Sequence, residues 1–343
     1  MNKFLVFAFL NVTLFLGYAI GENTKNHYSS NIKSTAYLNS LSSKKRKKIV
    51  RDLDGNAQKL LDNGNYIEAL EIYKTILSCK DLLKKQKSKY YCKIGNIYNL
   101  QNLYDLSIIN YKEAQYLYPK NLEIKISMAQ IHLNNSLYSL AEKLFKEVLE
   151  SDSKSEVAQI GLGNIYFYQK NYQKAAFYYE QVLSNDDKYS VLKLAFCYRQ
   201  LKKPSKALEI LNCFTKNKKA TEEIIFLVAI LLMDQGDFAK AKEKFIKYLE
   251  HGGSHIFQVY LHLANIYEAE NNLSKTKEFL EMANYINPNY AITNLMLARV
   301  FYKLKDINSS KKHARLAEQK SESSFVKEQS QKLVYFLDRN KFK

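Results

Sequence analysis

The quartet Gly-Asn-Ile-Tyr occurs at residues 95–98 and again at residues 163–166, and the variant Ala-Asn-Ile-Tyr occurs at residues 264–267. The first two copies are 68 residues apart, which is two periods of 34 residues. A fixed period of this length indicates a repeat architecture in which each unit packs only on its neighbours. The recurrence therefore constrains the whole chain, because a single short unit cannot bury its own apolar face.

Each unit reads as two helices joined by a polar turn. In the unit of the first quartet, apolar or small residues follow the i, i+3, i+4, i+7 spacing of one helix face: Tyr91, Ile94, Gly95 and Tyr98. After the polar pair at residues 101–102, a second stripe runs through Ser107, Tyr111 and Ala114. Pro119 ends the second helix, because proline has no backbone N–H to donate.

The same spacing recurs eight times between residues 50 and 322. One first-helix slot always holds a small residue: Ala57, Gly95, Ala129, Gly163, Ala195, Ala229, Ala264 and Ala298. One second-helix slot holds a larger side chain in seven of the eight units: Tyr73, Tyr111, Phe145, Tyr179, Leu211, Phe245 and Leu280, with Ala314 in the eighth. This pairing predicts that the two helices of each unit pack closely at the small residue.

The pattern resembles the tetratricopeptide repeat, although the tryptophan usual in its first helix is absent. The resemblance implies an all-α fold, a right-handed α-solenoid of about eight helix–turn–helix repeats over residues 50–322. Residues 323–343 are expected to form a capping helix and tail, since residues 325–340 are amphipathic and an open solenoid needs a polar end.

The N-terminal segment differs from the repeats. An apolar run over residues 4–20 precedes Gly21, which predicts an export signal cleaved after Gly21 or, alternatively, an uncleaved membrane anchor. Residues 22–49 are expected to be a flexible basic linker. Its basic run is predicted to contact anionic membrane, or else to be a solvated helix start: Lys44, Lys45, Arg46, Lys47 and Lys48. We therefore expect export to the periplasm or cell envelope of a bacterium.

The formal net charge of +18 favours acidic partners, membrane surfaces or nucleic acid. The sequence disfavours nucleic-acid binding, since many lysines fall on second helices rather than in one groove. The cysteines at 79, 92, 197 and 213 either form disulfides or remain half-buried free thiols. We expect no catalytic site, cofactor or metal: the histidine cluster at 251, 255 and 262 begins in a loop, where helical metal-ligand spacing is missing.

In tetratricopeptide proteins the exposed side of the first helices forms a concave groove. The resemblance assigns eighteen residues to a peptide-binding groove: Asn96, Asn99, Ile126, Gln130, Leu133, Ile160, Asn164, Phe167, Tyr168, Leu192, Phe196, Arg199, Phe226, Ile230, Met233, Leu261, Asn265 and Arg299. Recurring asparagines could bond a peptide backbone, and phenylalanines could form an apolar wall. The alternative is that these residues pack between first helices.

These observations predict a non-enzymatic scaffold or adaptor that binds peptide or helical segments of other proteins. The family's clamp for a C-terminal carboxylate places a lysine one turn before an inward asparagine. Cys92, Ile160 and Leu261 stand at those positions here, which disfavours that mode. The alternative function is a basic surface that binds anionic membrane or nucleic acid.

Overall fold

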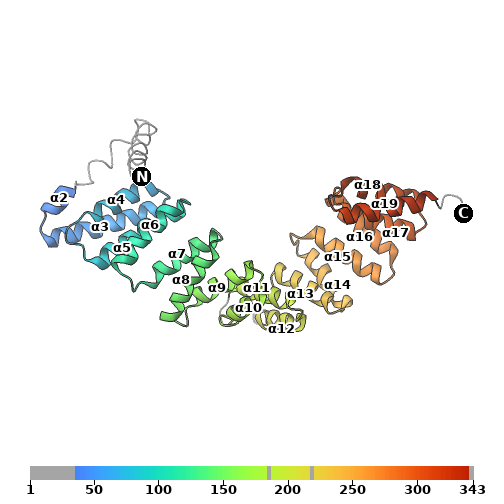
Figure 1. Cartoon of the computed structure of the whole chain (residues 1–343), viewed down its shortest axis with the longest axis horizontal. Helices are drawn as coiled ribbons and strands as arrows, with labels where there is room; N and C mark the ends of the chain where they lie inside the picture. Colours follow the sequence, from blue (N-terminus) through green and yellow to red (C-terminus); the bar gives the residue numbers. More distant parts are fainter. Residues whose placement is uncertain (1–34, 184–186, 217–219, 340–343) are drawn as a thin grey trace, which may run out of the picture. The chain divides into compact units, whose positions relative to one another are not determined.

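The computed structural model describes residues 35–183, 187–216 and 220–339 (Figure 1). Within these residues the chain forms eighteen helices, which confirms the all-α prediction. The short α2 (Thr35–Ser40) comes first. Eight helix pairs follow: α3 (Ser43–Asp62) with α4 (Tyr66–Leu77), α5 (Lys84–Leu100) with α6 (Tyr104–Leu117), α7 (Leu122–Asn134) with α8 (Tyr138–Ser151), α9 (Glu156–Tyr168) with α10 (Tyr172–Glu180), α11 (Lys188–Gln200) with α12 (Pro204–Thr215), α13 (Glu222–Asp234) with α14 (Phe238–Glu250), α15 (Ile256–Ala269) with α16 (Leu273–Ile286), and α17 (Ala291–Lys303) with α18 (Ile307–Lys320). Helix α19 (Ser324–Arg339) ends the described chain.

The chain divides into two compact units, with the boundary between Gly161 and Leu162 inside α9. We call them the first unit and the second unit. The first unit contains the described helices from α2 to α8, and the second contains those from α10 to α19. Each unit is described here by itself.

The helices of a pair meet where the first carries its small residue. A Cβ atom added at Gly95 would lie 3.0 Å from the Tyr111 ring, and one added at Gly163 would lie 2.7 Å from the Tyr179 ring. Both tyrosines are almost fully buried. The hydroxyl of Ser107 also donates to the Gly95 carbonyl across 2.8 Å, so a buried polar group is satisfied at this contact. Close packing, rather than turn flexibility, therefore requires these two glycines.

The turn inside each pair has one residue with a left-handed backbone conformation. Its φ lies between 60° and 79° at equivalent positions of all eight pairs: Gly64, Asn102, Ser136, Lys170, Lys202, Gly236, Asn271 and Lys305. Six of these are not glycine, although a side chain there costs about 1 kcal/mol or more. The neighbouring packing thus holds the turn conformation whatever residue occupies it.

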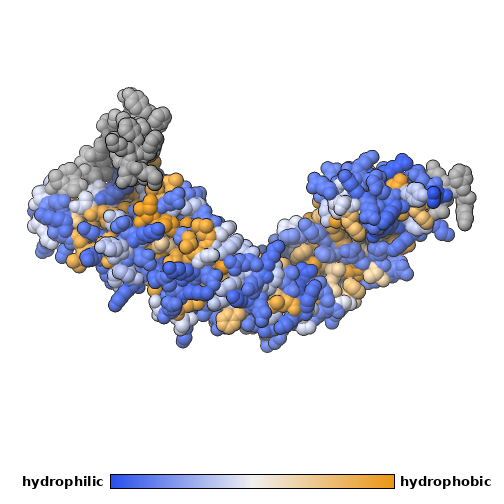
Figure 2. Space-filling view, viewed as in Figure 1, coloured by the Kyte–Doolittle hydropathy of each residue, from blue (hydrophilic) through white to orange (hydrophobic). Residues whose placement is uncertain are grey.

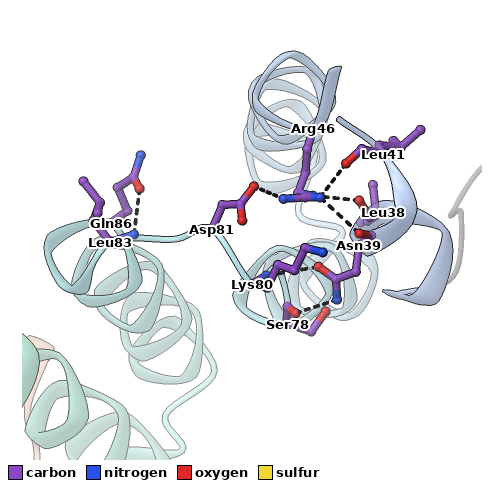
Figure 3. Close-up of polar contacts among 9 residues, drawn as sticks. All are labelled: Leu38, Asn39, Leu41, Arg46, Ser78, Lys80, Asp81, Leu83 and Gln86. Atoms are coloured by element: carbon purple, nitrogen blue, oxygen red, sulfur yellow. Dashed lines mark hydrogen bonds and ion pairs between the residues drawn. The ribbon is translucent and has the colours of Figure 1, made fainter. Parts of the chain in front are cut away.

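The N-terminal end of the first unit differs from the flexible linker expected over residues 22–49. Residues 22–34 lie outside the described residues, but Thr35–Ser40 is helical and α3 starts at Ser43. Arg46, predicted within a membrane-contacting run, is only 4% exposed. Its Nε donates to the Leu38 carbonyl at 2.8 Å, Nη2 donates to the Asn39 and Leu41 carbonyls, and Nη1 pairs with Asp81 (Figure 3). The prediction that Arg46 faces a membrane is wrong, because its guanidinium fastens α2 to α3.

Asn39 completes this closure. Its side-chain amide donates to the Ser78 carbonyl, and its oxygen accepts the Lys80 backbone N–H at 3.0 Å (Figure 3). Leu38 beside it is buried. Helix α2 is therefore held by hydrogen bonds to both α3 and the loop after α4 at the N-terminal end of the first unit.

The second unit ends on α19, which packs against α18 and α17. Val326, Ser330 and Leu337 are its buried residues, and Lys311 of α18 pairs with Asp338. Among the helices of the described chain, none combines the length and apolar character needed to cross a membrane. The apolar run at residues 4–20 and the cleavage position after Gly21 lie outside the described residues.

Candidate functional site

The structure places the eighteen predicted groove residues at three levels of exposure. Five are exposed: Asn96, Gln130, Tyr168, Asn265 and Arg299. Eleven are half-buried: Asn99, Ile126, Ile160, Asn164, Phe167, Leu192, Phe196, Arg199, Phe226, Met233 and Leu261. Two are buried: Leu133 and Ile230.

Leu133 and Ile230 are therefore not groove residues. They are 5% and 6% exposed, and Ile230 belongs to a core cluster with Phe245 and Tyr248. Phe226 packs against the same cluster and stacks on His255 with ring centroids 5.1 Å apart. Because Phe226 is committed to this cluster, it does not continue the wall expected from three phenylalanines.

The recurring asparagines have internal partners in two of three cases. The side-chain oxygen of Asn96 accepts a hydrogen bond from Tyr111, and that of Asn164 accepts one from Tyr179 at 2.8 Å. The position equivalent to these tyrosines in the repeat of Asn265 is Leu280, which has no hydroxyl to donate. Of the three, Asn265 alone keeps both its oxygen and its amide clear of other described side chains.

Aromatic rings gather on the first-helix side at α9 and α11. Phe167 of α9 lies 5.5 Å from Phe196 of α11, centroid to centroid, and Tyr172 lies about equally close to both, at 6.1 and 6.0 Å. Tyr168 contacts Phe167 edge to face at 5.9 Å and is 54% exposed. We call Phe167, Tyr168, Tyr172 and Phe196 the aromatic cluster. It combines rings held in place by one another with a ring that remains open to solvent.

Lys193 of α11 lies beside the aromatic cluster. Its Nζ donates to the Asn164 oxygen at 2.5 Å and lies 5.7 Å from the Phe167 ring centre and 5.5 Å from that of Tyr168. Burial lowers the pKa of this amine, and nearby Asp187 partly opposes the effect. Sequence reasoning missed Lys193, although its position one turn before Phe196 could have suggested it.

Ion pairs connect consecutive first helices elsewhere. In the first unit Lys93 of α5 pairs with Asp54 of α3 at 2.5 Å. In the second unit Arg199 pairs with Asp234 at 2.6 Å, and Lys303 pairs with Glu268 at 2.7 Å. Partly exposed pairs of this kind contribute little stability individually. These pairs neutralise lysine and arginine side chains of the first helices that would otherwise be unpaired in solvent.

The first unit has a hollow of about 530 Å³ at α5. Its lining includes Lys85, Lys89, Lys93, Asn96 and Tyr118. Lys89 and Lys93 both pair with Asp54, and Lys85 lies 5.3 Å from the Tyr118 ring centre. This part of the first-helix face carries more lysines than paired carboxylates, unlike the apolar groove expected from the sequence.

The three clustered histidines have separate surroundings. His251 contacts the Lys247 carbonyl, His255 bonds the Tyr248 hydroxyl at 3.0 Å, and His262 stacks on Phe245. In the described part of the chain, no three His, Cys, Asp or Glu side chains form a group that could hold a metal ion. The four cysteines carry free thiols, and burial raises the pKa of Cys92 to about 11 and that of Cys197 to about 12.

Comparison with known proteins agrees with this geometry. Models of the tetratricopeptide repeat match residues 88–121, 157–189 and 257–290. No curated protein matches the chain. The chain therefore contains several tetratricopeptide repeats, a scaffold typical of protein–protein interaction and generally without enzymatic activity.

Solved structures share the fold at low sequence identity. A tetratricopeptide repeat protein from Parabacteroides merdae matches with a TM-score of 0.50 and 17% identity, covering 74% of this chain and 98% of that one. PilW, a type IV pilus biogenesis factor, matches with a TM-score of 0.51 and 17% identity over 60% of this chain and 97% of its own. The APC/C hetero-tetramer Cut9–Hcn1 matches with a TM-score of 0.50 and 15% identity, over 88% of this chain and 58% of the matched chain. At such identities these likenesses concern the fold alone.

Proposed function

We propose that this chain is an exported scaffold that binds peptide or helical segments of partner proteins on the first-helix face of the second unit. The aromatic cluster carries this proposal. Large rings on a rigid helical surface supply contact area with little loss of conformational freedom, and such residues dominate binding energy at protein interfaces.

The surroundings of the cluster support an apolar partner with polar backbone contacts. Tyr168 presents an exposed ring, while Phe167 and Phe196 are half-buried and fixed by their mutual contact. Asn265 occupies the equivalent slot of Asn164 on a later first helix, and its side chain is exposed. A segment that lays an apolar side chain on the rings can thus find hydrogen-bonding groups on the same face.

The test is a selection of phage-displayed peptides on the full chain, followed by affinity measurement with variants. Tyr168→Ser combined with Phe196→Ser should weaken the selected peptides by at least about tenfold, since truncating a contact residue of this kind costs more than about 1 kcal/mol. The matched control combines Tyr285→Ser with Phe325→Ser, which are 89% and 65% exposed and lie in the same unit outside the cluster.

The control should bind as the unaltered chain does. Equal binding by the cluster variant, or a selection that yields no peptide, overturns the proposal. Phe196 is half-buried, so the thermal transition of each variant is measured as well. If the double variant unfolds, Tyr168→Ser alone replaces it, because that ring is mainly in solvent.

Export is a separate part of the proposal and rests on the sequence. The apolar run at residues 4–20 ends in Ala19-Ile20 and is followed by Gly21, and these residues before Glu22 suit signal cleavage. Mass spectrometry of the cellular protein should find Glu22 as the N-terminal residue in an envelope fraction. An intact Met1 in membrane pellets that resist high salt contradicts cleavage and indicates the anchor.

The charge-driven alternative receives less support. Arg46 is buried and two lysines of the α5 hollow pair with Asp54, so neither the basic run nor this hollow presents its full charge. Lysines on second helices, including Lys143 and Lys247, are exposed as an outer solvated face. We therefore favour protein partners over a polyanion.

A further inference from the structure

Leucines gather where first helices turn into second helices in two repeats of the first unit. Six aliphatic side chains lie at or beside the α5–α6 and α7–α8 turns, and each is between 37% and 61% exposed: Leu100, Leu103, Leu106, Ile109, Leu137 and Leu140. We call these six residues the turn-edge patch. Figure 2 shows hydrophobic residues gathered over α6 on the visible face. Patches of several hundred Å² on a protein surface commonly mark interaction sites.

The patch has the period of the repeat. Leu103 and Leu137 are 34 residues apart, as are Leu106 and Leu140, so each pair occupies one slot of adjacent repeats. The two repeats are packed together, because Leu144 of α8 contacts the cluster that contains Tyr111 of α6. Equivalent slots of stacked repeats fall on the same edge, which brings the leucines to one side of the first unit.

The helix starts show that the fold does not need these leucines. Leu103 and Leu137 are the N-cap residues of α6 and α8, with φ, ψ of −87°, 66° and −83°, 61°. Asn171 has nearly the same backbone, −83°, 72°, and its side chain accepts the Lys174 backbone N–H at 3.2 Å. Asp237, Asn272 and Asp306 cap their helices in the same way. Leucine cannot accept that hydrogen bond, at a cost of about 1 kcal/mol per helix.

The next exposed slot shows the same contrast. Where α6 and α8 have Leu106 and Leu140, the four following second helices have lysine: Lys174, Lys206, Lys240 and Lys275. A lysine in this slot keeps water on the surface, whereas leucine leaves apolar area exposed. The α5–α6 and α7–α8 repeats therefore lack both the N-cap hydrogen bond and the lysine that other repeats have at this turn.

The charge around the patch indicates what covers it. Residues 100–152 hold five lysines and seven acidic residues, in a chain whose net charge is +18. Two copies that met through basic faces would repel each other, whereas this nearly neutral segment lets them approach. Six aliphatic residues with exposed fractions of 37–61% provide on the order of several hundred Å² per copy, which with a polar rim approaches the roughly 800 Å² per partner of a stable interface.

We propose that the turn-edge patch is the contact face between two copies of this chain, paired about a two-fold axis. In such an interface the same patch is used on both copies, so Leu103 and Leu137 of one lie against the equivalent edge of the other. The turn-edge patch consists of first-unit residues alone, so each copy of a pair would still carry its own proposed peptide-binding residues. The inference is independent of the proposed peptide binding.

The test is the mass in solution of the full chain, measured by light scattering and sedimentation equilibrium from about 1 to 100 µM, where interfaces of this size associate. The unaltered chain should reach the mass of two copies. Leu103→Asn with Leu137→Asn should remain a single copy over the whole range. It should be at least as stable as the unaltered monomer, because asparagine supplies the missing caps.

A second variant separates loss of dimerisation from misfolding. Leu106→Lys with Leu140→Lys introduces the residue that four other repeats have in this slot. This variant should also stay monomeric. Tyr285→Asn removes an 89% exposed apolar ring outside the patch and should dimerise normally. An unaltered chain that stays monomeric at the highest concentration overturns the proposal in favour of a different protein partner. Dimerisation of either patch variant, or its loss in Tyr285→Asn, also overturns it.

Discussion

The two units share one helix-pair geometry but differ in the side chains they present to solvent. At the turn edge two repeats of the first unit have Leu103 and Leu137. On nearly the same backbone, the remaining repeat of that unit has Asn65, and the second unit has Asn171 and Asp237. Because the backbone is common, this difference does not come from folding. We attribute it to the different contacts that we propose for the two units.

The first-helix faces of the two units also differ in the side chains that they carry. In the first unit Lys89 and Lys93 share Asp54, which leaves a charged surface with one lysine in excess. In the second unit Phe167 and Phe196 contact each other beside Lys193. The units therefore differ in the kind of apolar side chain that they expose, aliphatic residues around the α5–α6 and α7–α8 turns of the first and aromatic rings at α9 in the second.

The largest effect that we predict comes from removing the Arg46 contacts that hold α2 at the N-terminal end of the first unit. Arg46→Met keeps the length of the side chain but loses its bonds to the Leu38 and Asn39 carbonyls and leaves Asp81 unpaired. Removing one partner of such a buried, charge-assisted network should cost about 3 kcal/mol. Chemical denaturation measures the loss, and hydrogen exchange should locate it in α2 and α3.

Lys47→Met is the matched control, because Lys47 is the exposed neighbour on the same helix. It should leave the unfolding free energy unchanged, since surface substitutions away from specific contacts have small effects. Equal losses for both variants would mean that helix propensity or net charge, rather than the buried guanidinium, stabilises this end.

A smaller effect comes from exchanging the turn-edge residues between units. Asn272 accepts the Lys275 backbone N–H at 3.1 Å, so Asn272→Leu should lower the unfolding free energy by about 1 kcal/mol. Leu103→Asn should raise it by a similar amount, provided that both are measured at a concentration where the chain is monomeric. If Leu103→Asn is destabilising instead, the leucine has a packing role and the two units do not share one geometry at this edge.

The sequence predicted the parts of the fold that depend on periodic packing. The slot of Gly95 and Gly163 and the aromatic residues opposite it, Tyr111 and Tyr179, follow from one period of 34 residues, and the structure brings them into contact. A bond between Asn96 and Tyr111 could also have been inferred, because the same spacing of 15 residues recurs in Asn164 and Tyr179.

Other features could not be predicted because they depend on contacts without a period. Arg46 appeared to belong to a solvated basic run, and only the fold of α2 brings three carbonyls around it. Ile230 shares its slot with the exposed Asn265 and Arg299, yet the structure buries it with Phe245 and Tyr248. Sequence spacing gives the face of a helix, but the depth of a residue on that face depends on its neighbours.

The smallest effect we predict is a difference in acid sensitivity between the units. Burial lowers the pKa of His132 in the first unit and of His262 and His313 in the second. Their ordinary value is 6.5, so on acidification the unfolded chain takes up protons before the folded one. Stability is therefore complete above pH 6.5 and falls as the pH drops through that value toward the lowered pKa values.

Thermal unfolding between about pH 5 and 8 tests this, since carboxylates titrate mainly below that range. His262→Phe with His313→Phe should flatten the decline more than His132→Tyr does, because two lowered histidines are removed rather than one. His262 stacks on Phe245, and the slot of His132 holds tyrosine at Tyr98 and Tyr166. His313→Phe keeps the stacking on Phe301 but removes a hydrogen bond to the buried Asn294, so each variant is compared with its own stability at pH 8. A steeper decline in the double variant, or an equal effect of His132→Tyr, would mean that other groups control the acid response and that the units do not differ in this property.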